Sequence, residues 1–191
     1  MRLGLPLPFA AWMEKCSCGK QLDREGYHLI TCKTGGGPVW THNTIVGAWS
    51  ECLRHLHIVH KKEPKHRYLE SEDRPDIVAV DPETGGDKEL DVSMAHPWAL
   101  DVVSNAAAVD GAAAYRREEL KRSLYRSKSL PGGVAPNFVP LVMEHFGRWG
   151  MDAQNFLNQL SLIKKHVNLA NSVQNFKSYW RTRFSVALQT V

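Results

Sequence analysis

Hydrophobic positions along the chain recur with two different periods, and together they predict a mixed α/β fold. Between residues 40 and 57, apolar side chains return every three or four positions, which is the spacing of an amphipathic helix. A β-branched stretch that ends near Glu63 predicts a short strand. Residues 77–80 and 88–94 predict two further strands, and the proline and paired glycines within 82–86 are typical of a hairpin turn.

The second half of the chain continues to alternate helices and strands. Residues 102–125 are rich in alanine and then in charge, which predicts one long helix that runs through Gly111. Residues 138–144 predict a fourth strand, and 152–169 and 171–188 predict two further helices. The expected order is therefore α, β, β, β, α, β, α, α, which belongs to the α/β fold class. An apolar stripe in the tail is expected to pack on the core: Phe156, Leu157, Leu160 and Ile163.

Composition narrows the class of protein only slightly. With 191 residues and 43% hydrophobic side chains, the chain can form one compact domain and a small appendage. It contains no apolar run of about 20 residues, and its apolar start lacks the basic segment of a secretion signal. We therefore expect an intracellular protein, nuclear if it is eukaryotic. The net charge of +4 favours a polyanionic partner, but only weakly.

Three of the four cysteines lie within 17 residues near the start of the chain, with a histidine between them. Cys16, Cys18, His28 and Cys32 form the pattern C-x-C-x9-H-x3-C, and Gly19 permits a tight turn after the first pair. Zn²⁺ prefers four tetrahedral thiolate and imidazole ligands, and a complete shell is typical of a structural site. The alternative is three free thiols and a surface histidine.

These features divide the chain into two parts. We expect a zinc knuckle and a glycine-rich linker in residues 1–37, followed by the main domain in residues 38–191. The core of that domain should end near residue 150, and the last two helices should occupy 151–191. Cys52 lies among leucines on a predicted helix and is expected in the core rather than in a metal site.

Two aspartates on the predicted hairpin are candidate metal ligands. Asp76 begins one strand and Asp91 lies in the middle of the other, which brings them onto neighbouring strands about 5 Å apart. Two carboxylates there could share Mg²⁺ or Mn²⁺, which can ionise an attacking water and stabilise a leaving oxygen. Glu63 is expected to assist as a third carboxylate, and Glu51 on the first helix is its rival. The alternative is that these carboxylates are ordinary surface groups.

The order of the motifs resembles a known family. Arg74-Pro75-Asp76-Ile77 and Leu90-Asp91-Val92, on this order of strands, look like the PD-(D/E)XK nuclease fold with its αβββαβ core. The match becomes narrower with the Cys/His cluster, Gly-Gly-Gly at 35–37, His42-Asn43, Glu63-Pro64 and Leu-Asp-Val-x-x-x-His-Pro at 90–97. Over about residues 16–150, the chain is similar to the restriction-like endonuclease at the C-terminus of site-specific non-LTR retrotransposon proteins.

That resemblance implies a function and a set of partners. It implies a Mg²⁺- or Mn²⁺-dependent endonuclease that hydrolyses DNA and leaves a 3′ hydroxyl for target-primed reverse transcription. It also implies that the chain is part of a larger reverse-transcriptase polyprotein. The sequence is compatible with duplex, branched or RNA-containing substrates, and with a monomer or an oligomer.

The chain departs from the nuclease pattern at one position. The lysine of the D-x-K motif falls at Ser93, which carries no charge. The resemblance places the missing cation on the following helix, at Arg117, Lys121 or both, and we favour Lys121. Arg117, Lys121 and Tyr125 are spaced four residues apart and should share one helical face. An ammonium there could orient the water and offset phosphate charge.

Further polar residues are candidates for nucleic-acid contacts. His42 and Asn43 could approach the site or the DNA, or could lie at a helix start with Asn43 as the cap. An alternative for the basic helix face is a solvated surface with a Glu118–Arg122 pair. The side chains expected to neutralise phosphates are Arg116, Arg122, Lys164 and Lys165.

Two other functions are compatible with the same residues. A catalytically inactive module of this fold could bind nucleic acid or protein, and Ser93 in place of a lysine favours it. A zinc-knuckle adaptor without catalysis would leave the carboxylates as surface groups.

Overall fold

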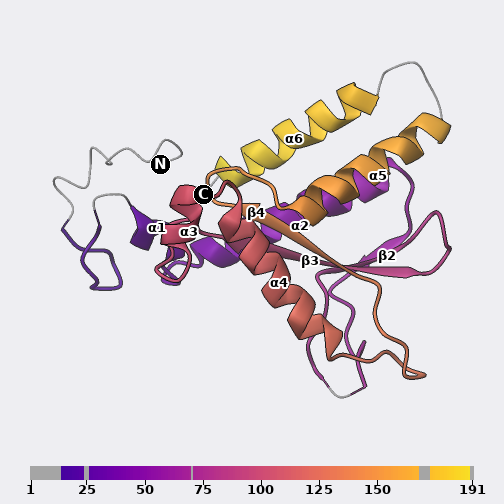
Figure 1. Ribbon diagram of the computed structural model, residues 1–191, viewed down its shortest axis with the longest axis horizontal. Coiled ribbons are helices and arrows are strands. Elements are labelled where there is room, and N and C mark those ends of the chain that lie inside the picture. The colour runs from indigo at the N-terminus through magenta and orange to yellow at the C-terminus, as the bar shows by residue number, and fades with distance from the viewer. Residues whose placement is uncertain (1–13, 24–25, 70, 168–172, 190–191) are drawn as a thin grey trace.

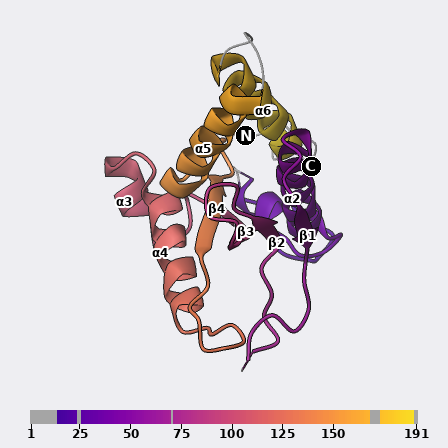
Figure 2. The ribbon, with the colours of Figure 1, turned by 90° about the vertical axis from the view of Figure 1, so that its right-hand side faces the viewer.

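The computed structural model describes residues 14–23, 26–69, 71–167 and 173–189, and the statements below refer to them. A four-stranded mixed sheet lies between two layers of helices (Figure 1, Figure 2). The strands are β1 (His60–Lys62), β2 (Ile77–Val80), β3 (Asp87–Ala95) and β4 (Phe138–Glu144). The helices are α1 (Tyr27–Thr31), α2 (Gly37–His55), α3 (Val103–Ala108), α4 (Ala112–Arg126), α5 (Met151–Val167) and α6 (Val173–Gln189). The predicted α/β class is confirmed.

The strands lie side by side in the order of the chain, β1-β2-β3-β4. β1, β2 and β3 are antiparallel neighbours, whereas β4 runs parallel to β3. A parallel pair needs a crossover connection, and α3 and α4 supply it. The predicted hairpin is confirmed, because Ile77 pairs with Leu90 and the Asp81 N–H donates to the Gly86 carbonyl oxygen over 2.7 Å.

Helices cover both faces of the sheet. The main core lies beneath α2, α5 and α6, where the rings of Trp49 and Phe184 are fully buried with centroids 4.5 Å apart. The apolar stripe of α5 packs on this core and Cys52 is buried within it, as predicted. α4 covers the opposite face through Ala113 and Ala114 (Figure 2). Among the described residues, no helix has the length and apolar character that crossing a membrane requires.

β3 is buried on both faces, and its alternating side chains therefore meet two different environments. Leu90 and Val92 point into the main core. Asp91 and Ser93 point to the other face, where α4 covers them, and both are almost fully buried. Because successive residues of a strand face opposite sides of the sheet, this register places two polar side chains beneath α4.

Two helix boundaries differ from the prediction. The helix expected over 102–125 is broken in two, because Gly111 adopts a φ of 81° and caps α4 in the left-handed region. The prediction of one continuous helix was therefore wrong. α2 begins at Gly37, inside the expected glycine linker. Gly36 supplies its left-handed N-cap, and Pro38 is compatible with the first turn because that turn needs no N–H donor.

Gly150 packs so closely against α4 that no side chain fits there. A Cβ at Gly150 would overlap the Glu118 Oε1 and would lie 3.1 Å from the Val142 carbonyl oxygen. Glu118 is buried and its Oε1 accepts the Asp152 N–H, which holds the carboxylate in place. We expect Gly150→Ala to lower the free energy of unfolding by about 1–3 kcal/mol through overpacking, as measured by urea denaturation.

A second glycine provides the control for this prediction. A Cβ at Gly47, inside α2, would meet nothing within 4 Å. Gly47→Ala is therefore expected to leave the free energy of unfolding unchanged or to raise it by up to about 1 kcal/mol. Equal effects of the two substitutions would show that Gly150 is not sterically required.

Candidate functional site

The two predicted aspartates lie opposite each other beneath α4. Ile77 pairs with Leu90, so Asp76, one residue before β2, lies opposite Asp91 in the middle of β3. The side chain of Asp76 also bonds to β3 beside Asp91: its Oδ2 accepts the Val92 N–H over 2.6 Å. The predicted neighbourhood of the two carboxylates is confirmed.

A histidine from α2 completes the surroundings of Asp76. The His42 Nε2 lies 3.1 Å from the Asp76 Oδ1, and this hydrogen bond raises the pKa of His42. The prediction that His42 approaches the site is therefore confirmed. Asn43 is exposed one position further along α2. Its predicted role as a helix cap is wrong, because α2 begins six residues earlier, at Gly37.

Asp91 is held by two side chains of α4. Its Oδ1 accepts the Tyr125 hydroxyl over 2.8 Å, and its Oδ2 lies 2.7 Å from the Lys121 ammonium. The ammonium is close enough to share its charge and a proton with this buried oxygen. Burial raises the pKa of Asp91, and the positive charge of Lys121 opposes that rise.

The side-chain contacts to Asp91 and to Ser93 come from one face of α4. Arg117, one turn before Lys121, donates from its Nε to the Ser93 Oγ over 2.6 Å. Arg117, Lys121 and Tyr125 thus follow β3 from Ser93 to Asp91, which confirms the predicted shared face. Two cations of α4 therefore lie over Ser93 and Asp91.

The two glutamates considered as a third carboxylate pair with arginines in this structure. Glu63 lies just beyond the end of β1, and its half-exposed carboxylate pairs with the Arg74 guanidinium over 2.9 Å. Its backbone meets the site, where the Glu63 N–H donates to the Asp76 carbonyl oxygen over 2.8 Å. Glu51 points to α6 and pairs with Arg183 over 2.6 Å. Glu63 as a third metal ligand stays a prediction, whereas its rival Glu51 is directed away from the pair.

The basic residues expected to bind nucleic acid have different surroundings. Arg116 is exposed and pairs with Asp101 over 2.9 Å. The Arg122 guanidinium is surrounded by three carboxylates, those of Glu118, Glu119 and Asp152. The alternative of a Glu118–Arg122 pair is thus confirmed. The charge of Arg122 is neutralised by these carboxylates in this structure, which does not favour the predicted contact with a phosphate. The side chains of Lys164 and Lys165 lie outside the described residues.

A buried carboxylate that the sequence analysis missed supports the same strand. Glu89 is fully buried two residues before Asp91, and it accepts hydrogen bonds from the Tyr68 hydroxyl and from the Arg67 Nε at 2.8 Å. These bonds attach the segment between β1 and β2 to the sheet. The signal in the sequence was that Glu89 lies in phase with Asp91, on either side of the apolar Leu90.

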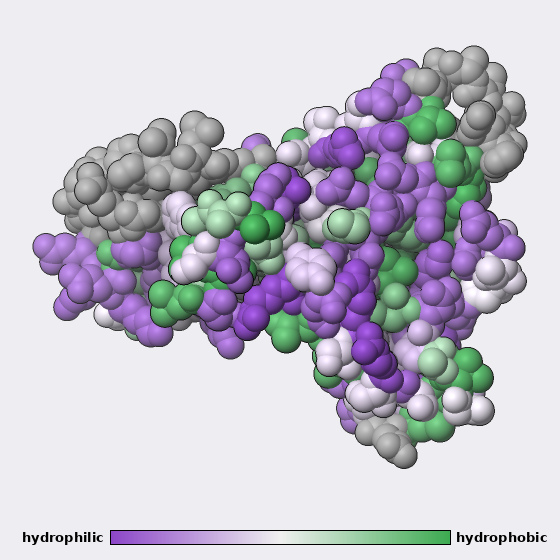
Figure 3. All heavy atoms as spheres, viewed as in Figure 1, coloured by the Kyte–Doolittle hydropathy of each residue, from purple (hydrophilic) through white to green (hydrophobic). Residues whose placement is uncertain are grey.

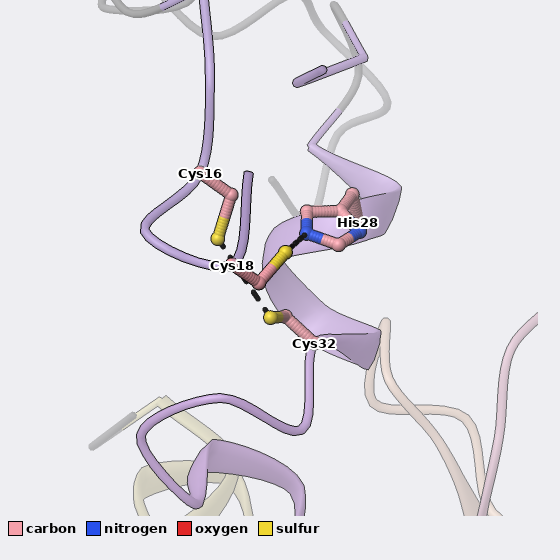
Figure 4. Close-up of side chains that lie close together, drawn as sticks. All are labelled: Cys16, Cys18, His28 and Cys32. Atoms are coloured by element: carbon pink, nitrogen blue, oxygen red, sulfur yellow. Dashed lines mark hydrogen bonds between the residues drawn. The ribbon is translucent and has the colours of Figure 1, made fainter. Parts of the chain in front are cut away.

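The four predicted zinc ligands lie together at the other end of the described chain (Figure 4). Their ligand atoms all lie within 4.8 Å of one another, with 3.7 Å between the Cys16 and Cys32 sulfurs and 3.1 Å between the Cys18 sulfur and the His28 Nε2. Zn–S bonds of ~2.3 Å in a tetrahedron separate two sulfurs by about 3.8 Å. These residues are therefore close enough together, and of the right kind, to bind a zinc ion.

The local backbone explains how these side chains converge. Gly19 adopts a φ of 87° and its N–H donates to the Cys16 carbonyl oxygen over 2.8 Å, which makes the predicted tight turn. The Asp23 carboxylate accepts the N–H groups of Tyr27 and His28, each over 2.6 Å, and so orients α1. A hydrogen bond from the Cys18 backbone N–H lowers the pKa of the Cys16 thiol to about 6, which favours the thiolate that a metal requires.

Metal analysis tests this cluster directly. We expect the purified chain to contain one zinc ion and Cys32→Ser to lose it, because three ligands hold zinc more weakly than four. Cys52→Ala is the matched control, since Cys52 is buried in the core and distant from the cluster in the fold. Zinc content per chain, measured by mass spectrometry of the metal, decides the question. Full zinc content in Cys32→Ser would contradict the four-ligand assignment.

No protein-family model matches this chain, and no curated protein does. The function is accordingly inferred from the geometry described above.

Proposed function

We propose that the chain is a Mg²⁺- or Mn²⁺-dependent DNA endonuclease of the PD-(D/E)XK type. The observation that carries this proposal is the placement of Asp76 beside Asp91 on β2 and β3, with the Lys121 ammonium 2.7 Å from Asp91. Paired carboxylates and an adjacent cation are what hydrolysis of a phosphodiester requires of a protein that uses a divalent metal ion. The order α2, β1, β2, β3, α4, β4 agrees with the αβββαβ core of that fold.

The carboxylate pair is suited to a hard divalent cation. Asp76 and Asp91 would hold it, and the Oδ2 of Asp91, which among the described residues meets only the Lys121 ammonium, would share its second lone pair with the cation. Mg²⁺ favours one or two carboxylates and completes its shell with water and phosphate oxygens. When bound, such a cation supplies the acidity that ionises water and the charge that stabilises the leaving oxygen.

The residues around the pair have distinct roles in this proposal. Lys121 balances the charge of Asp91 and offers its ammonium to a phosphate oxygen, where negative charge develops. Tyr125 is a positioning residue that orients the Asp91 carboxylate through its hydroxyl. His42 is a positioning residue as well, and it orients the Asp76 carboxylate through its Nε2. Because burial raises the pKa of Tyr125, its hydroxyl remains a neutral donor at physiological pH.

The biological setting follows from the resemblance and belongs to the proposal. The resemblance is to the restriction-like endonuclease of site-specific non-LTR retrotransposon proteins, which implies action within a larger reverse-transcriptase polyprotein, in the nucleus if the protein is eukaryotic. Hydrolysis that leaves a 3′ hydroxyl would provide the primer end for reverse transcription. The cluster of Cys16, Cys18, His28 and Cys32 would bind a structural zinc ion that folds the knuckle before the nuclease domain.

Nicking of a supercoiled plasmid tests the proposal. The protein should be assayed in metal-depleted buffer without a chelator, so that the zinc cluster stays intact, and then with Mg²⁺ or Mn²⁺ added. We expect nicked circles only with an added cation, and nicks that a DNA polymerase extends directly from their 3′ hydroxyls. DNA binding without nicking under every cation would overturn the proposal in favour of an inactive binding module.

A further inference from the structure

A pocket of about 190 Å³ opens next to the carboxylate pair, between the end of β3 and the first half of α4. Its wall is mainly apolar and includes Met94, Ala99 and Leu120. Its polar lining includes Arg116, Arg117 and His96. On the face of the protein shown in Figure 3, hydrophobic residues are interspersed among predominantly hydrophilic ones. A pocket with an apolar wall and convergent polar groups is typical of a ligand site.

Arg117 lies between this pocket and the carboxylate pair. Ser93, which accepts the Arg117 Nε, is two residues beyond Asp91 and therefore about 7 Å further along β3. The two terminal nitrogens of Arg117 have no hydrogen-bond or ion-pair partner among the described residues. The neighbouring Arg116, in contrast, is neutralised by Asp101. Arg117 thus presents a positive charge at the edge of the pocket that faces the site.

His96 contributes a neutral aromatic ring to the lining of the pocket. Its Nδ1 accepts the Trp98 N–H over 3.1 Å, so the proton of the neutral ring resides on Nε2. Burial lowers the pKa of His96 to about 4, which keeps the ring neutral at physiological pH. The Nε2 is shielded from solvent among the aromatic rings of Tyr27, Trp98 and Phe146. His96 therefore adds apolar ring surface to the wall and no charge.

We infer that this pocket receives one unpaired nucleotide of the DNA strand that is cut, adjacent to the scissile phosphate. This inference rests on the proposed function. Arg117 would contact the phosphate of that nucleotide, and the base would lie against the wall formed by Met94, Ala99 and Leu120. A paired base has both faces covered by its stacked neighbours, so a base can lie against this wall only after it has left the duplex.

The substrate class follows from this arrangement. An intact duplex must first release a base from its stack, whereas a bulged or branched duplex already has one free. We therefore expect a duplex with a one-nucleotide bulge to be nicked next to the bulge at least about 10-fold faster than the fully paired duplex of the same sequence.

Two measurements on the same oligonucleotides test the inference. The fluorescent base 2-aminopurine is placed at the bulged position, and its emission is recorded on binding without any added divalent cation. Movement of the base from its stacked neighbours into the pocket should raise the emission several-fold. Nicking rates with Mg²⁺ are then measured on the bulged and paired duplexes, which reports on the proposed nuclease separately.

Two leucines on exposed turns of α4 provide a matched pair of variants. Leu120 lines the pocket and is 51% exposed, whereas Leu124, one turn further along α4, is 47% exposed and does not line it. Leu120→Glu places a carboxylate at the pocket and should abolish both the rise in emission and the preference for the bulge. Leu124→Glu adds the same charge to the same helix and should retain both. Ala99→Phe, which fills the pocket without adding charge, should reproduce the loss seen with Leu120→Glu.

The possible outcomes separate the pocket from the nuclease. Nicking with no preference for the bulge and no change in emission would overturn the pocket and leave the nuclease intact. A rise in emission that Leu120→Glu abolishes and Leu124→Glu retains, in a protein that never nicks, would support the nucleotide pocket and overturn the proposed nuclease. Equal losses in Leu120→Glu and Leu124→Glu would assign the effect to charge on α4 and overturn the pocket.

Discussion

Replacement of Asp91 by asparagine is expected to reduce cation-dependent nicking by at least about 10³-fold, which equals about 4 kcal/mol of transition-state stabilisation. Asparagine keeps the size of the side chain and an oxygen that can accept the Tyr125 hydroxyl, 2.8 Å from the Asp91 Oδ1. It removes the negative charge that would hold the cation and that now pairs with Lys121. The initial rate of plasmid nicking at saturating Mg²⁺ measures the effect.

Asp87→Asn is the matched control on the same strand. Asp87 lies four residues before Asp91, is partly exposed and pairs with Arg67 over 2.6 Å, so its loss should leave nicking unchanged. DNA binding without added cation should be retained in both variants. Undiminished nicking by Asp91→Asn would remove Asp91 from the site, whereas loss of nicking in both variants would indicate a disturbed strand rather than a lost metal ligand.

The second large effect is expected from Lys121→Met, which should reduce nicking by about 10²–10³-fold, the range seen when a single transition-state donor is removed. Methionine keeps a similar unbranched stem but lacks the ammonium that lies 2.7 Å from the Asp91 Oδ2. Lys121→Arg should recover part of the rate because it restores a positive charge. Arg126→Met, an exposed position on the last turn of α4, is the control and should nick normally.

The pH dependence of nicking distinguishes a direct role of Lys121 from a purely structural one. Burial raises the pKa of Asp91 and Lys121 opposes that rise, so removal of Lys121 should raise the pKa of Asp91 further. A carboxylate with a higher pKa becomes ionised at higher pH, and the acidic limb of the pH–rate profile should therefore move to higher pH in Lys121→Met. An unchanged profile with a normal rate would transfer the role of the missing lysine to Arg117.

Predictions based on local spacing agreed with the structure where one element determined the outcome. The hairpin was predicted from its turn residues, and its register brings Asp76 opposite Asp91. The helical face of Arg117, Lys121 and Tyr125 was predicted from a spacing of four residues, and all three contact the polar side of β3. Such predictions succeed because strand and helix periods follow from backbone geometry alone.

Predictions that depended on how two elements pack were less successful. Glu63, with Glu51 as its rival, was expected at the metal site, but their carboxylates pair with Arg74 and Arg183. The rotation of α2 about its axis decides this, because it turns His42 towards Asp76 and Glu51 towards α6. Burial of Trp49 against Phe184 sets that rotation, and spacing within α2 could not reveal which distant residues its polar side chains then meet.

The sequence by itself determined the order of the elements, the four residues of the cysteine cluster and the pairing of the two aspartates. Each of these depends on neighbours in the chain, on turn chemistry or on ligand spacing. Only the tertiary structure decided which cation meets Asp91, that Arg122 is surrounded by carboxylates, and that a pocket lies beside Ser93. These outcomes depend on side chains from distant segments, whose contacts form only when α4 packs on the sheet and shields them from water.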